Sequence, residues 1–182
     1  MRLFVGLEID PGARVRLAAL AKRLEDRGLR GRYEHPSKYH VTLAFLGNAA
    51  PARLVEFAAA MHEVGSASRA FSLHVDRIGA FPNERNPRIV WAGCRAQPAE
   101  YRKLATALHA AYEALGLTLR NEHVAHVTLC RPEERAHLPM LGRSPSIEIA
   151  AEALALFESL PADGTTRYEV RERAPLAATT GG

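Results

Sequence analysis

The sequence contains the same tetrapeptide twice, because residues 40–43 and residues 126–129 both read His-Val-Thr-Leu. Each copy lies in a segment that predicts a β-strand, over residues 39–46 and 124–131. In a strand, residues two apart project from the same face, so the histidine and threonine of each copy face one way while the valine and leucine face the core. One copy alone would be ordinary strand sequence. Two copies predict a pair of strands that present histidine and threonine toward one cleft.

The order of the other elements predicts an α+β fold with mostly antiparallel strands. An alternating strand over 1–9 is followed at Asp10-Pro11 by a helix start, with a capping residue and a proline at the first helical position. The strongest helical pattern covers 98–115, and His109 on it is expected to be at least half-exposed. Helices do not alternate regularly with strands, which excludes a doubly wound nucleotide-binding fold. Further helices are expected over 11–28 and 51–64, and further strands over 70–78, 88–94, 147–157 and 167–173.

Length and composition indicate a single globular unit. The chain has 182 residues, of which 47% are hydrophobic and 24% charged, close to the globular average. No linker divides it, so we expect two lobes of one domain over 1–173, followed by a flexible tail over 174–182. No apolar run approaches the ~18–20 residues of a membrane span, and the N-terminus lacks the order of a signal peptide. These features predict a cytoplasmic protein with no membrane association.

The charged residues and the cysteines limit which ligands and which cross-links the sequence predicts. Basic residues exceed acidic ones by 24 to 20, and 21 of the 24 are arginine. The arginine fork fits phosphate, so the bias is compatible with a phosphate-bearing partner, although the 32 alanines in the same chain also suggest genome composition. Cys94 and Cys130 form no CxxC pair, so neither a disulfide framework nor a cysteine zinc site is indicated.

The repeated motif carries the residue types that acid–base attack on a phosphate requires. Opening a cyclic phosphodiester needs a base that takes a proton from water and an acid that protonates the departing oxygen. Histidine, with a pKa near 6.5, does either at neutral pH, so His40 and His126 are the candidates. The hydroxyls of Thr42 and Thr128 can donate to the non-bridging oxygens, and Arg131 can supply fixed positive charge. This chemistry requires no metal.

With these residues in place, the chain resembles the 2H phosphoesterases, and within them the bacterial and archaeal RNA 2′,3′-cyclic phosphodiesterases, also described as 2′-5′ RNA ligases. Their hallmark is a duplicated His-x-Thr/Ser-x motif, which the two tetrapeptides match. The resemblance covers nearly the whole chain. Its other matching segments are Met1 to Val5, the extended first motif His40 to Gly47, Phe81-Pro82, Arg88 to Trp91, and Leu129 to Arg131.

The resemblance implies a bilobal fold whose motifs face each other across a central cleft. It implies RNA ends with a 2′,3′-cyclic phosphate as substrates, opened by water to leave a 2′-phosphate. By the same analogy His40 donates a proton to O3′ and His126 accepts one from water. With a 5′-hydroxyl RNA end in place of water, the site would make a 2′-5′ linkage. No cofactor is implied, and a monomer is expected.

Phe45 lies where relatives place an aromatic residue that stacks on the terminal base, five residues after the first motif histidine. Strict alternation puts Phe45 on the face opposite His40, in the core. Strand twist or a bulge near Gly47 would reverse that placement. The sequence leaves both placements open.

Two other functions are compatible with the same residues. One is a 2H phosphodiesterase that acts on another small cyclic phosphate, such as an ADP-ribose cyclic phosphate, or on a 2′-5′ oligonucleotide. The other is a non-catalytic module that binds RNA ends. The intact histidines and threonines of both motifs count against the second.

Overall fold

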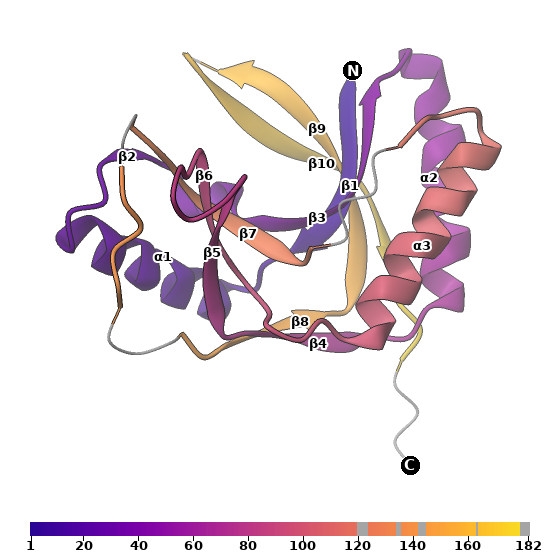
Figure 1. Cartoon of the computed structure of the whole chain (residues 1–182). Helices are drawn as coiled ribbons and strands as arrows, with labels where there is room; N and C mark the ends of the chain where they lie inside the picture. The colour runs from indigo at the N-terminus through magenta and orange to yellow at the C-terminus, as the bar shows by residue number, and fades with distance from the viewer. Residues whose placement is uncertain (120–123, 134–135, 142–144, 163, 179–182) are drawn as a thin grey trace.

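Among the residues that the structure describes, two four-stranded sheets and one two-stranded ribbon carry the fold (Figure 1). The strands are β1 (Arg2–Glu8), β2 (Gly31–Tyr33), β3 (His40–Asn48), β4 (Phe71–Val75), β5 (Arg77–Phe81), β6 (Ile89–Gly93), β7 (His126–Pro132), β8 (Ile147–Ala151), β9 (Ala153–Ala162) and β10 (Thr165–Pro175). The helices are α1 (Pro11–Asp26), α2 (Leu54–Ala67) and α3 (Ala99–Ala114), with 3-10 turns at Pro36–Lys38 and Pro51–Arg53. The computed structural model describes residues 1–119, 124–133, 136–141, 145–162 and 164–178.

The strand order divides the molecule into two halves. One sheet has the order β10-β9-β1-β3 and the other β2-β7-β6-β5, while β4 pairs with β8. Every pairing between these strands is antiparallel. Figure 1 shows α2 and α3 lying together over the first sheet and α1 beneath the second. This arrangement confirms the expected α+β class, with helices on the outside of two antiparallel sheets.

The first helix begins and ends as the sequence predicts. The Asp10 side chain accepts a hydrogen bond from the Ala13 amide at 2.8 Å, which satisfies one of the unpaired amides of the first turn. Pro11 occupies the first turn, where a missing N–H costs nothing. Gly28 follows the last turn with a φ of 91°, a conformation that suits glycine.

Two expected strands are each divided in the structure. The segment 70–78 breaks at Asp76, whose carboxylate accepts a hydrogen bond from the Arg95 amide at 2.8 Å, and it supplies β4 and β5 to different sheets. The segment 147–157 breaks at Glu152 into β8 and β9. The strand β2 was not expected, because three residues are too few to show a periodic pattern.

The expected tail begins later than residue 174. The strand β10 continues to Pro175, and Leu176 is buried with its amide donating to the Glu152 carbonyl at 2.8 Å. The Ala177 amide donates to the Ser68 carbonyl at 2.8 Å. The chain is therefore packed beyond residue 173, since these backbone groups and an apolar side chain find partners there. Residues 179–182 lie outside the described part of the chain.

The strand β3 contains a bulge within the first motif. Gly6 of β1 lies opposite Thr42, and the next residue back, Val5, lies opposite Ala44, so Leu43 has no partner of its own in the register. An extra residue of this kind reverses which face the following side chains occupy. Ala44 and Leu43 are both buried, and Phe45 returns to the face of Thr42.

The strand β7 has a bulge at the same place in the second motif. Trp91 of β6 lies opposite Thr128, and Val90 lies opposite Cys130, so Leu129 is the extra residue. The consequence is also the same, because Arg131 returns to the face of Thr128. The two motifs therefore share a backbone irregularity as well as a sequence.

Both bulge carbonyls accept hydrogen bonds. The Leu43 carbonyl accepts one from His109 Nε2 at 3.2 Å, and the Leu129 carbonyl accepts one from the Glu34 amide at 2.9 Å. His109 is only 6% exposed, so the expected exposed or half-exposed placement is wrong. Its helical position faces the sheet, and the bulge gives its ring a polar partner in the core.

Replacing His109 with leucine should destabilise the protein. Leucine fills a similar volume with apolar atoms but leaves the buried Leu43 carbonyl without its donor. The loss should lower the free energy of unfolding by about 1–3 kcal/mol. Urea unfolding followed by circular dichroism measures the difference. The control is His62→Leu on α2, where the histidine is exposed and its contact with Glu172 is a surface pair. Equal stabilities of the two variants would contradict the role of His109.

Candidate active site

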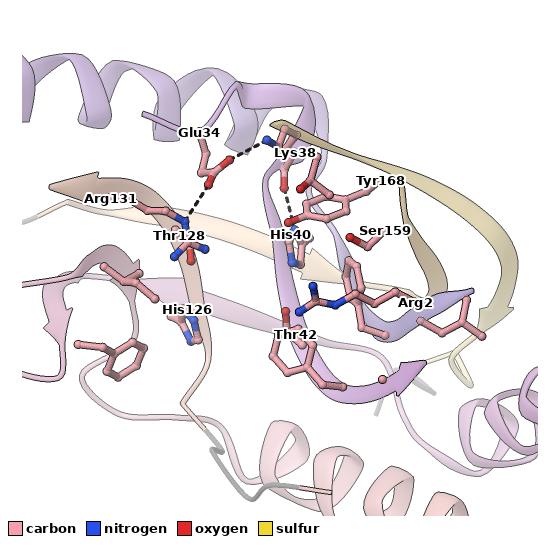
Figure 2. A pocket seen from close by; sticks show the side chains of 17 residues that line it. Arg2, Glu34, Lys38, His40, Thr42, His126, Thr128, Arg131, Ser159 and Tyr168 are labelled. Carbon is pink, nitrogen blue, oxygen red and sulfur yellow. Dashed lines mark hydrogen bonds and ion pairs between the residues drawn. The ribbon is translucent and has the colours of Figure 1, made fainter. Parts of the chain in front are cut away.

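The two halves enclose a cavity of about 420 Å³, lined by residues of β1, β3, β5, β6, β7, β9 and β10 and of the segment that precedes β3. Figure 2 shows the two motif histidines on opposite sides of this cavity, each with its threonine nearby. The structure thus forms the central cleft that the repeated motif predicts. Every residue that the sequence singled out lines it: His40, Thr42, Phe45, His126, Thr128 and Arg131.

The two histidines are held in the same way. His40 Nδ1 donates to the Lys38 carbonyl at 2.7 Å, and His126 Nδ1 donates to the Val124 carbonyl at 2.7 Å. A carbonyl can only accept, so each ring carries a proton on Nδ1. In both rings, proton exchange with a substrate is therefore directed to Nε2. The carbonyl in each case belongs to the residue two before the histidine, so the repeat extends to the backbone partner.

The ring of His40 lies in an aromatic cluster. Its centroid is 4.9 Å from that of Phe4, 5.7 Å from that of Phe157 and 5.0 Å from that of Tyr168, which meets it edge-on. Burial in this cluster lowers the pKa of His40, and the charge of protonated His126 lowers it further. The bond to the Lys38 carbonyl acts in the opposite direction. The net effect favours the neutral form of His40.

The ring of His126 has a separate aromatic support. Phe81 meets it edge-on with the centroids 5.1 Å apart, and Trp91 lies at 6.0 Å. Phe81 and Trp91 belong to β5 and β6 of the same sheet as His126. Each histidine is therefore packed against aromatic side chains of its own half.

Phe45 is exposed and borders the cavity. Its side chain is 66% accessible, and its ring centroid is 6.0 Å from that of Phe4. Of the two placements that the sequence allowed, the structure has the one that faces the cavity. The cause is the bulge at Leu43, which lies two residues earlier than Phe45 and well before Gly47.

Glu34 is a cavity residue that sequence reasoning missed. Its carboxylate lies 3.0 Å from Lys38 Nζ and 3.4 Å from Arg131 Nε (Figure 2). Burial raises the pKa of Glu34, but the hydrogen bond and charge of Lys38, together with the charge of Arg131, lower it below the usual range. Glu34 thus remains charged and holds Arg131 beside Thr128. The only sequence signal was its position six residues before His40.

Four further cavity residues come from strands that are distant in sequence, and no local pattern marks them. They are Arg2, Ser159, Thr166 and Tyr168. Within the described ranges, no three histidine, cysteine, aspartate or glutamate side chains gather as they would around a metal ion. Among the same residues, no helix has the length and hydropathy of a membrane span.

Comparison with known proteins places this geometry in a family. Residues 7–91 match the family model described as LigT-like phosphoesterase. A protein of Archaeoglobus fulgidus named RNA 2′,3′-cyclic phosphodiesterase is 30% identical over 136 residues, which cover 74% of each chain. A protein of Thermus thermophilus with the same name is 29% identical over 195 residues, which cover the whole of this chain and 93% of the relative.

Solved structures agree with the sequence relatives. A crystal structure of a Thermus thermophilus protein superimposes with a TM-score of 0.82 at 26% identity, covering 97% of this chain and 98% of the other. E. coli LigT in complex with 3′-AMP gives a TM-score of 0.81 at 25% identity, covering 96% and 97% of the two chains. The chain therefore belongs to the LigT-like phosphoesterase family, the 2H phosphoesterases.

The aromatic cluster predicts that His40 titrates below the ordinary histidine pKa of about 6.5. His40 should be neutral at pH 7 and gain its proton only as the pH falls below that value. The unfolded chain binds this proton more readily, so His40 lowers the stability of the folded protein as the pH falls below about 6.5. An NMR titration, with the resonance assigned by its loss in His40→Gln, measures the midpoint. Histidine resonances of the urea-unfolded protein are the reference, and a native midpoint at or above theirs would contradict the prediction.

Proposed function

We propose that this protein hydrolyses the 2′,3′-cyclic phosphate at RNA ends and leaves a 2′-phosphate. The observation that carries the proposal is the pair of histidines that face one cavity, each with its Nδ1 proton held by a backbone carbonyl. The names of the relatives from Archaeoglobus fulgidus and Thermus thermophilus support the substrate class. Membership of a phosphoesterase family supports hydrolysis over mere binding.

The two histidines divide the proton transfers. His126 Nε2 takes a proton from water as the water oxygen bonds to phosphorus. The bond from phosphorus to O3′ breaks, and His40 Nε2 gives its proton to O3′, which leaves a 3′-hydroxyl and a 2′-phosphate. These roles follow the family resemblance. The negative charge of bound substrate favours protonated His40, which offsets the lowering of its pKa by the aromatic cluster.

The remaining cavity residues bind the phosphate and the base. The Thr42 and Thr128 hydroxyls donate to the non-bridging oxygens as charge builds on them. Glu34 engages Arg131 at Nε, so the guanidinium presents its two Nη groups to the phosphate. Phe45 stacks on the terminal base, a contact worth about 1–3 kcal/mol for any base.

The same site would also accept a 5′-hydroxyl RNA end in place of water. Deprotonated by His126, the 5′-oxygen would bond to phosphorus as the bond to O3′ breaks and His40 protonates O3′, which forms a 2′-5′ linkage. Hydrolysis and ligation use the same proton transfers, so they share every residue named above. Ligation is therefore proposed as a minor activity of the hydrolytic site.

Incubation of the purified protein in EDTA with a short RNA that ends in 2′,3′-cyclic phosphate tests the proposal. Separation of 2′- and 3′-phosphate products by chromatography should give the 2′-phosphate alone. A 3′-phosphate product would refute the assigned leaving group. Binding without product would favour an RNA-end-binding module, and turnover of an ADP-ribose cyclic phosphate or a 2′-5′ oligonucleotide in its place would identify another substrate.

Replacing either motif histidine should remove most of the activity. In His40→Ala and His126→Ala, kcat should fall by about 10²–10⁴, the usual contribution of a positioned acid or base. Circular dichroism should show that both variants stay folded. The matched control is His74→Ala on β4, an exposed histidine outside the cavity, which should keep wild-type turnover. Full activity in either motif variant would refute the two-histidine mechanism.

The threonines should act on the reaction rate through their hydroxyls. Thr42→Val and Thr128→Val keep the side-chain shape but remove one donor each, so we expect kcat to fall by about 10²–10³. Thr106→Val, at an exposed position of α3, provides the control for the same substitution. Steady-state kinetics with cyclic-phosphate-ended RNA measures all three. A loss confined to KM would show that the hydroxyls bind substrate without stabilising the transition state.

A further inference from the structure

A row of polar side chains crosses the first sheet on the cavity side. Arg2 of β1 lies opposite Ser159 of β9, and Ser159 lies opposite Tyr168 of β10. All three residues line the cavity. We call Arg2, Ser159 and Tyr168 the polar row. Because adjacent strands are about 4.8 Å apart, the row spans roughly 10 Å.

An aromatic row lies between the polar row and the Thr42 end of the sheet. Phe4, two residues after Arg2 on β1, lies opposite Phe45 on one side and Phe157 on the other. We call Phe4, Phe45 and Phe157 the aromatic row. Two residues of a strand span about 7 Å, so the polar row lies about 7 Å farther along the strands than the aromatic row. The Tyr168 ring reaches back to His40, with centroids 5.0 Å apart, and joins the row to the proposed reaction site.

The polar row offers hydrogen-bond donors and positive charge. No ion pair engages Arg2 within the described part of the chain, and Figure 2 shows its guanidinium directed into the cavity. Burial raises the pKa of Tyr168, so its phenol keeps its proton and can donate. The acidic side chain that lines the cavity, Glu34, is already engaged by Lys38 and Arg131. The surroundings of Arg2 therefore suit an anion.

We propose that the polar row binds the phosphodiester that precedes the cyclic phosphate in the RNA chain. The inference rests on the proposed function and refines it, because it makes oligonucleotide ends, rather than mononucleoside cyclic phosphates, the preferred substrates. The terminal nucleotide lies between the two phosphates, and its base stacks on Phe45 of the aromatic row. Arg2 supplies the charge, and Ser159 and Tyr168 supply hydroxyl donors.

Three substrates test the polar row in one experiment. They are uridine 2′,3′-cyclic phosphate, the dinucleotide UpU with a 2′,3′-cyclic phosphate end, and the same dinucleotide with a neutral methylphosphonate in place of its bridging phosphate. For the wild-type protein, kcat/KM for the dinucleotide should exceed that for the mononucleotide and for the methylphosphonate by about tenfold. Equal values for the two dinucleotides would overturn the proposal.

Arg2→Gln then assigns the effect to a residue. The ratio of kcat/KM for the dinucleotide to that for its methylphosphonate analogue should fall from about ten to near one. Arg16→Gln on α1, an exposed position away from the cavity, changes the net charge equally and should leave the ratio as it was. Ser159→Ala should lower the ratio more weakly. A loss in Arg2→Gln that is equal for all three substrates would overturn the proposal, because it would place Arg2 on the reacting phosphate.

The same substrates separate failure of the inference from failure of the proposed function. If no cyclic phosphate is opened, the proposed function fails, and the row is tested by binding alone. UpU with a 3′-phosphate end should then bind wild-type protein about tenfold more tightly than its methylphosphonate analogue, and Arg2→Gln should abolish the difference. Equal affinities would overturn the inference whatever the outcome of the activity assay.

Discussion

The paired bulges in β3 and β7 are the constraint on which the site depends. Strict alternation would carry each histidine and its threonine to one face and the residue five positions after the histidine to the other. One extra residue after each threonine reverses this, so Phe45 and Arg131 share the cavity with the two histidines. A buried imidazole and a backbone amide satisfy the bulge carbonyls, which stabilises an irregularity that would otherwise be costly in a core strand.

The two motifs share their backbone geometry, but the side chains packed around their histidines differ. Both rings are fixed at Nδ1 by the same local geometry, yet Phe4, Phe157 and Tyr168 surround only the first. Phe81 and Trp91 support the second. Positive charge is distributed unequally as well, since Glu34 holds Arg131 on the side of the second motif. In the proposed mechanism, two histidines with the same backbone geometry thus act as the acid and the base of one reaction.

Much of the fold and of the candidate site could be predicted from the sequence. The cap at Asp10, the alternating faces of each motif and the grouping of His40 and His126 follow from local rules. The strand register does not follow from local rules, because the bulges depend on how β3 and β7 pair with β1 and β6, and no local pattern encodes that pairing. For the same reason the sequence did not predict that Arg2 and Tyr168 line the cavity, because only the strand order brings them together. Nor did it predict the burial of His109, whose polar partner is a carbonyl in another element.

The bulges also determine which sequence changes this site tolerates. In a regular strand, one residue inserted or deleted after a motif would be harmful because it would switch the exposed face. Here the extra residue is already part of each strand. Deleting it would leave Phe45 or Arg131 four positions after its histidine, still on the cavity face of a regular strand, whereas inserting one more residue would turn that side chain toward the core. Substitutions at Ala44 and Cys130 alter packing without changing this count. The site should therefore tolerate a shorter motif strand better than a longer one.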